Sequence, residues 1–104
     1  MRMTSTNRAE IVGRLKAIES QLRGHGVAAL YLFGSFARDE ARENSDLDVF
    51  VDPGTQQFYD LEHFVGAYEV IRLALPDYEV DYGTRNGLSP YIRPGVEQEA
   101  IRIF

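Results

Sequence analysis

Apolar residues recur along the chain at two different spacings, and the changes between them divide it into alternating helices and strands. Over residues 8–23 the apolar side chains recur every three or four positions, which predicts an amphipathic helix that ends at Gly24. Asn7 and Glu10 resemble a capping box at its start. The continuous apolar run VAALYLF over residues 27–33 predicts a buried strand.

The same alternation continues through the middle of the chain. Residues 36–43, FARDEARE, form a short helical stretch, and residues 44–45 interrupt it before DLDVFVD, 46–52, alternates with the period of a strand. Helically spaced apolar residues then mark one face of a long helix over residues 58–75. Pro76 ends that helix.

The C-terminal third predicts a third strand and two weaker elements. YEVDYG, residues 78–83, has the composition of a strand, and AIRIF, residues 100–104, predicts a last one. The Ser-Pro step at 89–90 could start a short fourth helix, although the Pro-Gly pair at 94–95 argues against it. The element order predicts an α/β (α+β) fold, in which helices flank a mixed β-sheet.

Composition limits the classes of protein that this chain can represent. At 104 residues with 44% hydrophobic residues it has the size and content of one core, so we expect a single small domain over 1–104. The absence of cysteine excludes a disulfide framework, a thiolate zinc site and a cysteine nucleophile. No run approaches the roughly 18 apolar residues of a membrane helix, so we expect a soluble, cytoplasmic protein without membrane contact.

The charge balance argues against long polyanions as partners. Eleven basic and sixteen acidic residues give a net charge of −5, which is the wrong sign for holding a nucleic-acid backbone by counterion release. We therefore expect no direct nucleic-acid binding. Nearly all the basic residues are arginines, which favour bidentate pairing with phosphate or carboxylate groups, so the composition remains compatible with local anion sites.

A pair of aspartates is the first candidate for chemistry. Asp46 and Asp48 are separated by one residue, so on a strand both side chains leave the same face, about 6 to 7 Å apart along the chain. Two like charges at this spacing repel, and a cation would compensate them. Mg²⁺ is the natural candidate, because it binds through one or two carboxylates plus the phosphates of a substrate. The alternative is a pair of solvent-facing carboxylates on an edge strand.

A third carboxylate could serve a second metal ion, as phosphoryl or nucleotidyl transfer would require. A second metal ion can lower the pKa of the attacking hydroxyl, and it needs a further carboxylate ligand. Asp81 lies on the predicted strand 78–83 and could provide that ligand. Glu79 lies two residues earlier and would share the same face, so it is the competing candidate.

A glycine-serine step is the candidate for holding an anion. Gly34 and Ser35 lie where the first predicted strand turns into a helix, a position at which free backbone N–H groups favour a phosphate. Ser35 adds a hydroxyl donor, and Arg38, three residues further on, could reach the same triphosphate. The plainer alternatives are that Ser35 caps the helix and that Arg38 pairs with a nearby acid.

These features together form a spacing that resembles the polymerase-β-like nucleotidyltransferase superfamily. A Gly-Ser pair at 34–35 is followed, after ten residues, by Asp-x-Asp at 46–48. The segment GSFAR…SDLDVFVD, residues 34–52, is most similar to the minimal nucleotidyltransferases (MNT), and the third family carboxylate falls on Asp81. The resemblance covers residues 27–83 and implies metal-dependent nucleotidyl transfer on a nucleotidyltransferase-like fold.

The resemblance assigns a role to each motif residue. In that family the Gly-Ser turn binds the β and γ phosphates, the two motif aspartates chelate metal, and the third aspartate helps to activate the acceptor hydroxyl. It implies ATP as the substrate and Mg²⁺ as the cofactor, with two ions expected. Carried over, nucleotide binding falls on Gly34, Ser35 and Arg38, and catalysis and metal binding fall on Asp46, Asp48 and Asp81.

The small size suggests where the acceptor comes from. Larger members of the superfamily add a second domain that holds the base and the acceptor, so here a partner would supply the acceptor side. Many MNT proteins that this chain resembles are antitoxins encoded with HEPN-domain ribonuclease toxins. The resemblance therefore implies AMP transfer to a tyrosine of a cognate HEPN toxin within a hetero-oligomer. A binding-only antitoxin without turnover and transfer to a small hydroxyl acceptor such as an aminoglycoside remain as alternatives.

Two positions depart from the family pattern. Phe36 and Asp39 stand where family members often carry a polar or basic residue and a glycine, which bears on the phosphate contacts of the loop and motivates the binding-only alternative. Asp52 is interpreted as a turn residue. His25 and His63 lack a paired ligand spacing and are interpreted as ordinary residues.

Overall fold

The structure is a computed structural model that describes residues 8–42 and 45–104. Its elements in chain order are α1 (Arg8–Ala17), α2 (Glu19–Gly24), β1 (Val27–Phe33), α3 (Gly34–Ala37), β2 (Leu47–Pro53), η1 (Gln56–Tyr59), α4 (Leu61–Ala74), β3 (Val80–Thr84), η2 (Arg85–Gly87), α5 (Arg93–Glu99) and β4 (Ile101–Arg102). Within the described residues, no helix is both long and apolar enough to cross a lipid bilayer.

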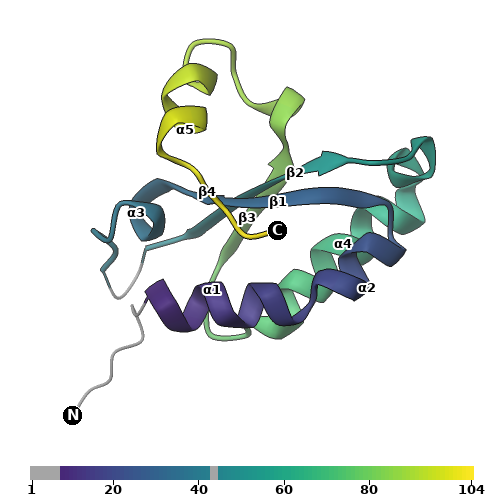
Figure 1. The fold of residues 1–104 in the computed structure, drawn as a ribbon, viewed down its shortest axis with the longest axis horizontal. Coiled ribbons are helices and arrows are strands. Elements are labelled where there is room, and N and C mark those ends of the chain that lie inside the picture. The colour runs from purple at the N-terminus through teal and green to yellow at the C-terminus, as the bar shows by residue number, and fades with distance from the viewer. Residues whose placement is uncertain (1–7, 43–44) are drawn as a thin grey trace.

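The strands form one mixed sheet with the order β3-β2-β1-β4. β1 is antiparallel to both of its neighbours, whereas β2 and β3 are parallel. A parallel pair needs a crossover connection, and α4 provides it. Helices α1, α2 and α4 cover one face of the sheet, while α5 lies on the other side (Figure 1). The predicted fold class, a mixed sheet flanked by helices, is confirmed.

The two faces of the sheet differ in character because alternate residues of a strand point to opposite sides. One face packs on α1, α2 and α4 and forms the hydrophobic core. Its strand residues are Leu30, Leu32, Leu47, Val49 and Val51. The residues between them, including Phe33 and Asp48, point to the opposite face, which α1, α2 and α4 leave uncovered and on whose side α5 lies. This face, uncovered by those three helices, is where the polar motif residue Asp48 of β2 lies.

The helix predicted over residues 8–23 is divided at Ile18. Its backbone leaves helical geometry there (φ −102°, ψ 13°), and its N–H donates to the Leu15 carbonyl three residues back instead of four. Ile18 and Leu22 are both buried, so the apolar periodicity continues across the break. A pattern of buried residues alone therefore cannot reveal this interruption.

The long helix predicted over residues 58–75 is also divided. Gln56–Tyr59 forms a short 3₁₀ turn, and Asp60 adopts an extended conformation before α4 begins. The Asp60 carbonyl accepts hydrogen bonds from the N–H groups of His63 and Phe64, as expected for the N-cap residue of a helix. Aspartate is favoured at this position, so the break has a chemical signal. The predicted end before Pro76 is confirmed.

The stretch predicted as helical over 36–43 is wrong in its extent. Helix α3 already starts at Gly34 and ends at Ala37, since Asp39 takes a left-handed conformation (φ 60°) that a helix cannot continue. Residues 43–44 lie outside the described residues, as does Asn7 of the predicted capping box.

The C-terminal helix forms later than the Ser-Pro step at 89–90 predicted. It runs from Arg93 to Glu99, with Pro94 in its first turn. Proline is tolerated there because its missing N–H would have no partner inside the helix. Strand β1 has the predicted bounds, and β2 and β3 are each displaced by one or two residues from the predictions at 46–52 and 78–83. A short last strand, β4, is confirmed.

Two leucines near the end of α4 test where the core lies. Leu75 is 0% exposed and Leu73 is 66% exposed. We predict that Leu75→Ala lowers the free energy of unfolding by about 2 to 5 kcal/mol, because it removes buried methyl groups and leaves a cavity. Leu73→Ala should change it by less than about 0.5 kcal/mol. Urea unfolding of both variants measures this, and equal effects would contradict the assigned core.

Candidate active site

A glycine bend at the end of β1 brings the backbone against an acidic side chain. Gly34 is buried and has a φ of +76°, a conformation that L side chains rarely adopt. A Cβ atom at this position would collide with Oδ2 of Asp48. Glycine is therefore required at this position both for the turn and for the close approach to Asp48.

The sheet places Asp48 between the glycine bend and the third aspartate. In the register of β1 and β2, Asp48 is paired with Phe33, the residue before Gly34. In the register of β2 and β3, it is paired with Asp81. Asp81, rather than Glu79, is thus the acidic residue directly beside Asp48. The predicted motif residues from three separate segments meet on the uncovered face of the sheet.

Asp46 occupies the outer end of this arrangement. It is exposed and immediately precedes β2, two residues before Asp48. Its charge is close enough to raise the pKa of the Asp48 carboxyl. The three predicted aspartates therefore form one electrostatically connected cluster, in which Asp46 and Asp81 are exposed and Asp48 is half-buried.

The half-buried Asp48 is poorly compensated when its carboxyl is ionised. Partial burial raises its pKa to about 6, and the charges of Asp81 and Asp46 and a hydrogen bond with Asp81 contribute in the same direction. The Arg38 charge opposes the shift only in part. Repulsion among like charges in a region of reduced solvation explains the direction. A bound divalent cation would relieve this repulsion.

The cluster fits Mg²⁺ as a site that is open on one side. Its donors are carboxylate oxygens, the ligands that Mg²⁺ prefers. Within the part of the chain that the structure describes, no three His, Asp or Glu side chains enclose a position for a cation by themselves. Asp46 and Asp48 are the carboxylates that would hold such an ion, and Mg²⁺ is usually held by one or two carboxylates together with waters and substrate phosphates.

Arg38 is already paired with acids. Its Nε donates to Glu40 at 2.9 Å, and its Nη1 donates to Oε1 and Oε2 of Glu99 at 3.0 and 3.1 Å. These hydrogen bonds, from Glu40 and then Glu99, raise the pKa of Arg38 above its ordinary value. The plainer alternative for Arg38, pairing with a nearby acid, is what the structure shows. Ser35 lies half-buried directly beside Gly34 in the first turn of α3.

The two departures from the family pattern have structural explanations. Phe36 is 1% exposed and packs edge-on against the Tyr78 ring at 5.5 Å, so its side chain belongs to the core. Asp39 adopts the left-handed conformation (φ 60°) that glycine adopts without strain.

Glu99 contacts the glycine bend, although no pattern in the sequence singles it out. Its Oε2 accepts a hydrogen bond from the Gly34 N–H at 3.0 Å. The two residues are 65 positions apart, and no local pattern reveals such a contact. The only sequence signal is an acidic residue at the end of a short helix, which is common at solvent-exposed positions.

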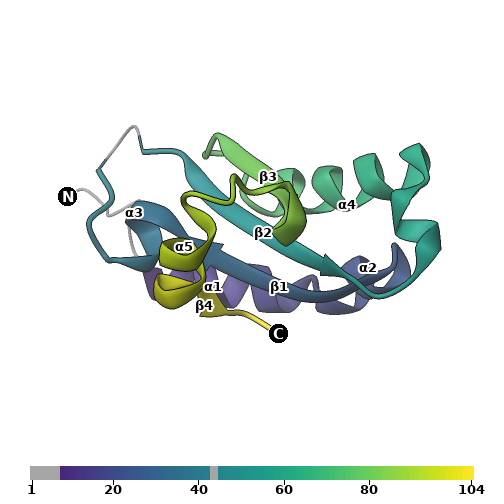
Figure 2. The ribbon, with the colours of Figure 1, turned by 90° about the horizontal axis from the view of Figure 1, so that it is seen from above.

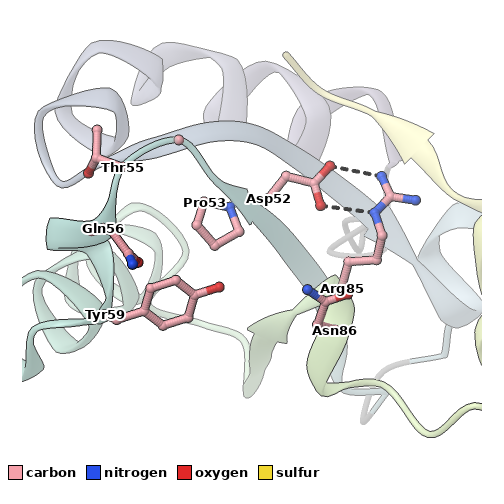
Figure 3. Close-up of a pocket in the computed structure, with 8 residues that line it drawn as sticks. Asp52, Pro53, Thr55, Gln56, Tyr59, Arg85 and Asn86 are labelled. Atoms are coloured by element: carbon pink, nitrogen blue, oxygen red, sulfur yellow. Dashed lines mark hydrogen bonds and ion pairs between the residues drawn. The ribbon is translucent and has the colours of Figure 1, made fainter.

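Asp52, interpreted from the sequence as a turn residue, forms a second polar cluster on the same face. It accepts two hydrogen bonds from Arg85, at 2.9 and 2.8 Å, and Arg85 also donates to Glu97 at 2.8 Å. Figure 3 shows the Asp52–Arg85 pair beside a hollow of about 500 Å³ that Tyr59 and Asn86 also line. The Arg85 guanidinium is therefore hydrogen-bonded to two carboxylates, those of Asp52 and Glu97.

A smaller hollow lies next to Asp81. Its volume is about 250 Å³, and its walls include the apolar side chains of Phe33, Leu88 and Ile92. It therefore places a mainly apolar surface beside one carboxylate of the cluster. His25 and His63, interpreted from the sequence as ordinary residues without a paired ligand spacing, contact each other elsewhere in the fold, with their Nδ1 atoms 3.3 Å apart.

Fold and site together define a nucleotidyltransferase domain. The profile of the nucleotidyltransferase domain family matches residues 12–103, and this chain belongs to that family. A solved structure described as a candidate minimal nucleotidyltransferase is 33% identical, with a TM-score of 0.76, over 91% of this chain and 94% of that one. The sequence-based assignment to this superfamily is confirmed.

Several relatives carry a more specific name. Protein adenylyltransferase MntA of Thermococcus cleftensis is 38% identical over 71 residues, which are 64% of this chain and 72% of the relative. A candidate protein adenylyltransferase of Methanocaldococcus jannaschii is 31% identical over 88 residues, 77% of this chain and 83% of the relative. A crystal structure of a toxin-antitoxin with AMP-PNP shares the fold, with 24% identity and a TM-score of 0.65 over 88% of this chain and 72% of that one.

The raised pKa of Asp48 predicts how the metal-free protein responds to pH. The folded state holds this proton up to about pH 6, against an ordinary pKa of 3.8, so the folded state binds the proton more tightly than the unfolded state. Stability should therefore fall as the pH rises from about 4 to about 6 and remain lower above that range. Asp48→Asn should raise the free energy of unfolding at pH 7 by about 1 to 2 kcal/mol after allowance for solvent screening.

Urea unfolding of the wild type and the variant at pH 4.5 and 7.5, without Mg²⁺, measures this difference. Asp77→Asn is the matched control, because Asp77 is exposed in the turn after α4. A lower stability of Asp48→Asn at pH 7 would contradict the assignment of Asp48 as an uncompensated carboxylate.

Proposed function

We propose that this chain is an antitoxin that transfers AMP from ATP to a tyrosine hydroxyl of a cognate HEPN-domain toxin in the cytoplasm, with Mg²⁺ as cofactor. The observation that carries the proposal is the position of Asp48, in contact range of Gly34 on one side and paired with Asp81 on the other. The relatives named protein adenylyltransferase support AMP as the transferred group. The toxin-antitoxin structure with AMP-PNP supports a nucleotide and a protein partner.

The reaction is a displacement at the α-phosphorus of ATP. The tyrosine oxygen forms a new bond to that phosphorus, the bond to the oxygen that bridges to the β-phosphate breaks, and pyrophosphate leaves. The hydroxyl proton is lost to Asp81 or through it to water, since Asp81 is exposed and is the carboxylate that lines the apolar hollow. The Gly34 N–H and the adjacent Ser35 hydroxyl are proposed to hold the departing β and γ phosphates.

Asp46 and Asp48 are the residues proposed to hold Mg²⁺, with Asp81 contributing to a second ion. When bound, Mg²⁺ neutralises negative charge on the phosphates and acts as a Lewis acid. The protein's own contribution is to keep the carboxylates on one face of a rigid sheet, so that little reorganisation is needed when the nucleotide arrives. Strand β2, which is paired on both sides, provides that rigidity.

The apolar hollow beside Asp81 is proposed to receive the ring of the acceptor tyrosine. Its volume of about 250 Å³ accommodates a phenol ring, and Leu88 and Ile92 offer apolar contacts to it. A ring in this hollow would place its hydroxyl next to the Asp81 carboxylate. This arrangement favours a protein tyrosine over a strongly polar acceptor such as an aminoglycoside.

Loss of one proposed metal ligand should abolish transfer. We predict that Asp46→Asn lowers the rate of AMP incorporation into the partner about a hundredfold or more, because charge developing at the reacting phosphate loses its stabilisation. The assay incubates the chain with α-labelled ATP, Mg²⁺ and the protein of the adjacent gene, and detects labelled partner. Chelation of Mg²⁺ with EDTA should have the same effect.

Asp77→Asn serves as the control for that experiment and should label the partner at the wild-type rate, since Asp77 is exposed in the turn after α4 and is none of the three motif aspartates. Unchanged labelling by Asp46→Asn would refute the metal assignment. Protection of cells by a triple variant with Asn at positions 46, 48 and 81 would instead favour a binding-only antitoxin.

The acceptor hollow can be tested without disturbing the core. Ile92 is 53% exposed, so Ile92→Asp is expected to fold normally. We predict that it raises the KM for the partner about tenfold, because a charge replaces an apolar contact with the acceptor ring, while the affinity for ATP stays within about twofold. Leu73→Asp, an equally drastic change on the helical face, should alter neither quantity. Equal loss of ATP affinity in Ile92→Asp would contradict this use of the hollow.

A further inference from the structure

The carboxylate of Glu99 occupies the glycine bend of the proposed nucleotide site. Oε2 of Glu99 accepts the Gly34 N–H at 3.0 Å, and Nη1 of Arg38 donates to both carboxylate oxygens at 3.0 and 3.1 Å. Glu99 is the last residue of α5, which lies next to α3 in both Figure 1 and Figure 2. The Glu99 carboxylate therefore accepts hydrogen bonds from both the glycine bend and Arg38.

The donors that hold Glu99 are the same kinds of group that hold a phosphate. A backbone N–H freed by a glycine and an arginine guanidinium both bind carboxylates and phosphates through charge-assisted hydrogen bonds. The proposed function assigns Gly34 to the triphosphate, and the resemblance to the nucleotidyltransferase family assigns Arg38 to it as well. The side chain of Glu99 is thus an internal anion at a position where an external anion is expected.

Both anions cannot occupy the bend together. The Gly34 N–H has a single hydrogen, and a second acceptor would receive a weakened bond. A phosphate placed there beside Glu99 would also meet a like charge, and Asp48 already adds negative charge next to Gly34. The nucleotide therefore has to displace Glu99 before its phosphates can use these donors.

We propose that Glu99 is an internal competitor for the nucleotide phosphates, which keeps the glycine bend closed in the free protein and weakens ATP binding. This inference rests on the proposed function, because it assumes that the phosphates bind at Gly34. Competition of this kind makes the apparent affinity for ATP equal to the intrinsic affinity multiplied by the fraction of molecules in which the bend is free.

The structure allows Glu99 to leave without unfolding its helix. Its side chain is 26% exposed, so rotation about its own bonds carries the carboxylate into solvent. Helix α5 keeps a second attachment to the sheet through Glu97, which accepts a hydrogen bond from Arg85 at 2.8 Å. β4 follows directly and is paired with β1. A change at Glu99 therefore leaves these other attachments of α5 in place.

The test compares two isosteric substitutions on the same helix. Glu99→Gln removes the charge that competes at the bend, and Glu97→Gln removes an equal charge two residues away. Isothermal titration of the full chain with ATP and Mg²⁺, and separately with inorganic triphosphate, gives the dissociation constants. We expect Glu99→Gln to bind both about three- to tenfold more tightly than wild type, and Glu97→Gln to bind them like wild type.

Glu99→Asp provides a second variant that retains the charge but is too short to hold the same contacts, and it should also bind ATP more tightly than wild type. If the wild type binds ATP and both Glu99 variants bind it equally well or more weakly, the proposed competition is wrong and the proposed function still stands. An equal gain in Glu97→Gln would show a general charge effect and overturn it as well. If neither the wild type nor any variant binds ATP or triphosphate, both the competition and the proposed function are wrong.

Discussion

The ionised carboxylate of Asp48, half-buried among other acids, is the constraint from which the rest of the site follows. Glycine at position 34 is required because any side chain there would strike this carboxylate. The parallel pairing of β2 with β3 brings Asp81 beside it, and Asp46, which immediately precedes β2, adds a further negative charge. The fold thus maintains an arrangement that costs stability in the metal-free protein, as is common where a site is preorganised for a ligand.

The fold tolerates this loss of stability because the hydrophobic core and the acidic cluster lie on opposite faces of the sheet. Leu47 and Val49, the neighbours of Asp48 on β2, are buried against the helical layer and anchor the strand. The repulsion at Asp48 acts on the opposite face, where Asp46 and Asp81 are exposed and water screens their charges. Core packing and the acidic cluster therefore use alternate residues of the same strand without competing for the same space.

Much of the fold was readable from the sequence because it depends on local periodicity. The run over residues 27–33 is a strand with the predicted bounds, and the Asp-x-Asp spacing on β2 needed only the period of a strand. The break at Ile18 could not be predicted because buried apolar residues continue across it. At Asp60 the apolar residues Phe58 and Leu61 imitate a continuous helix, although Leu61 is 77% exposed and an aspartate is a common N-cap residue of a helix. The contact between Gly34 and Glu99 could not be read at all, because it depends on how α5 is placed in three dimensions.

The charges around the bend also affect whether a nucleotide would bind as the free anion or together with a divalent cation. ATP alone would bring several negative charges to a surface that already carries Asp46, Asp48 and Asp81, and Arg38 is neutralised by its own acidic partners. Repulsion would oppose that encounter at any moderate ionic strength. A nucleotide that arrives with its divalent cation brings the compensating charge with it. Under the proposed function, the acidic cluster would therefore favour the magnesium complex of ATP over free ATP, because the cation that relieves the repulsion at Asp48 would also make the approach of the phosphates favourable.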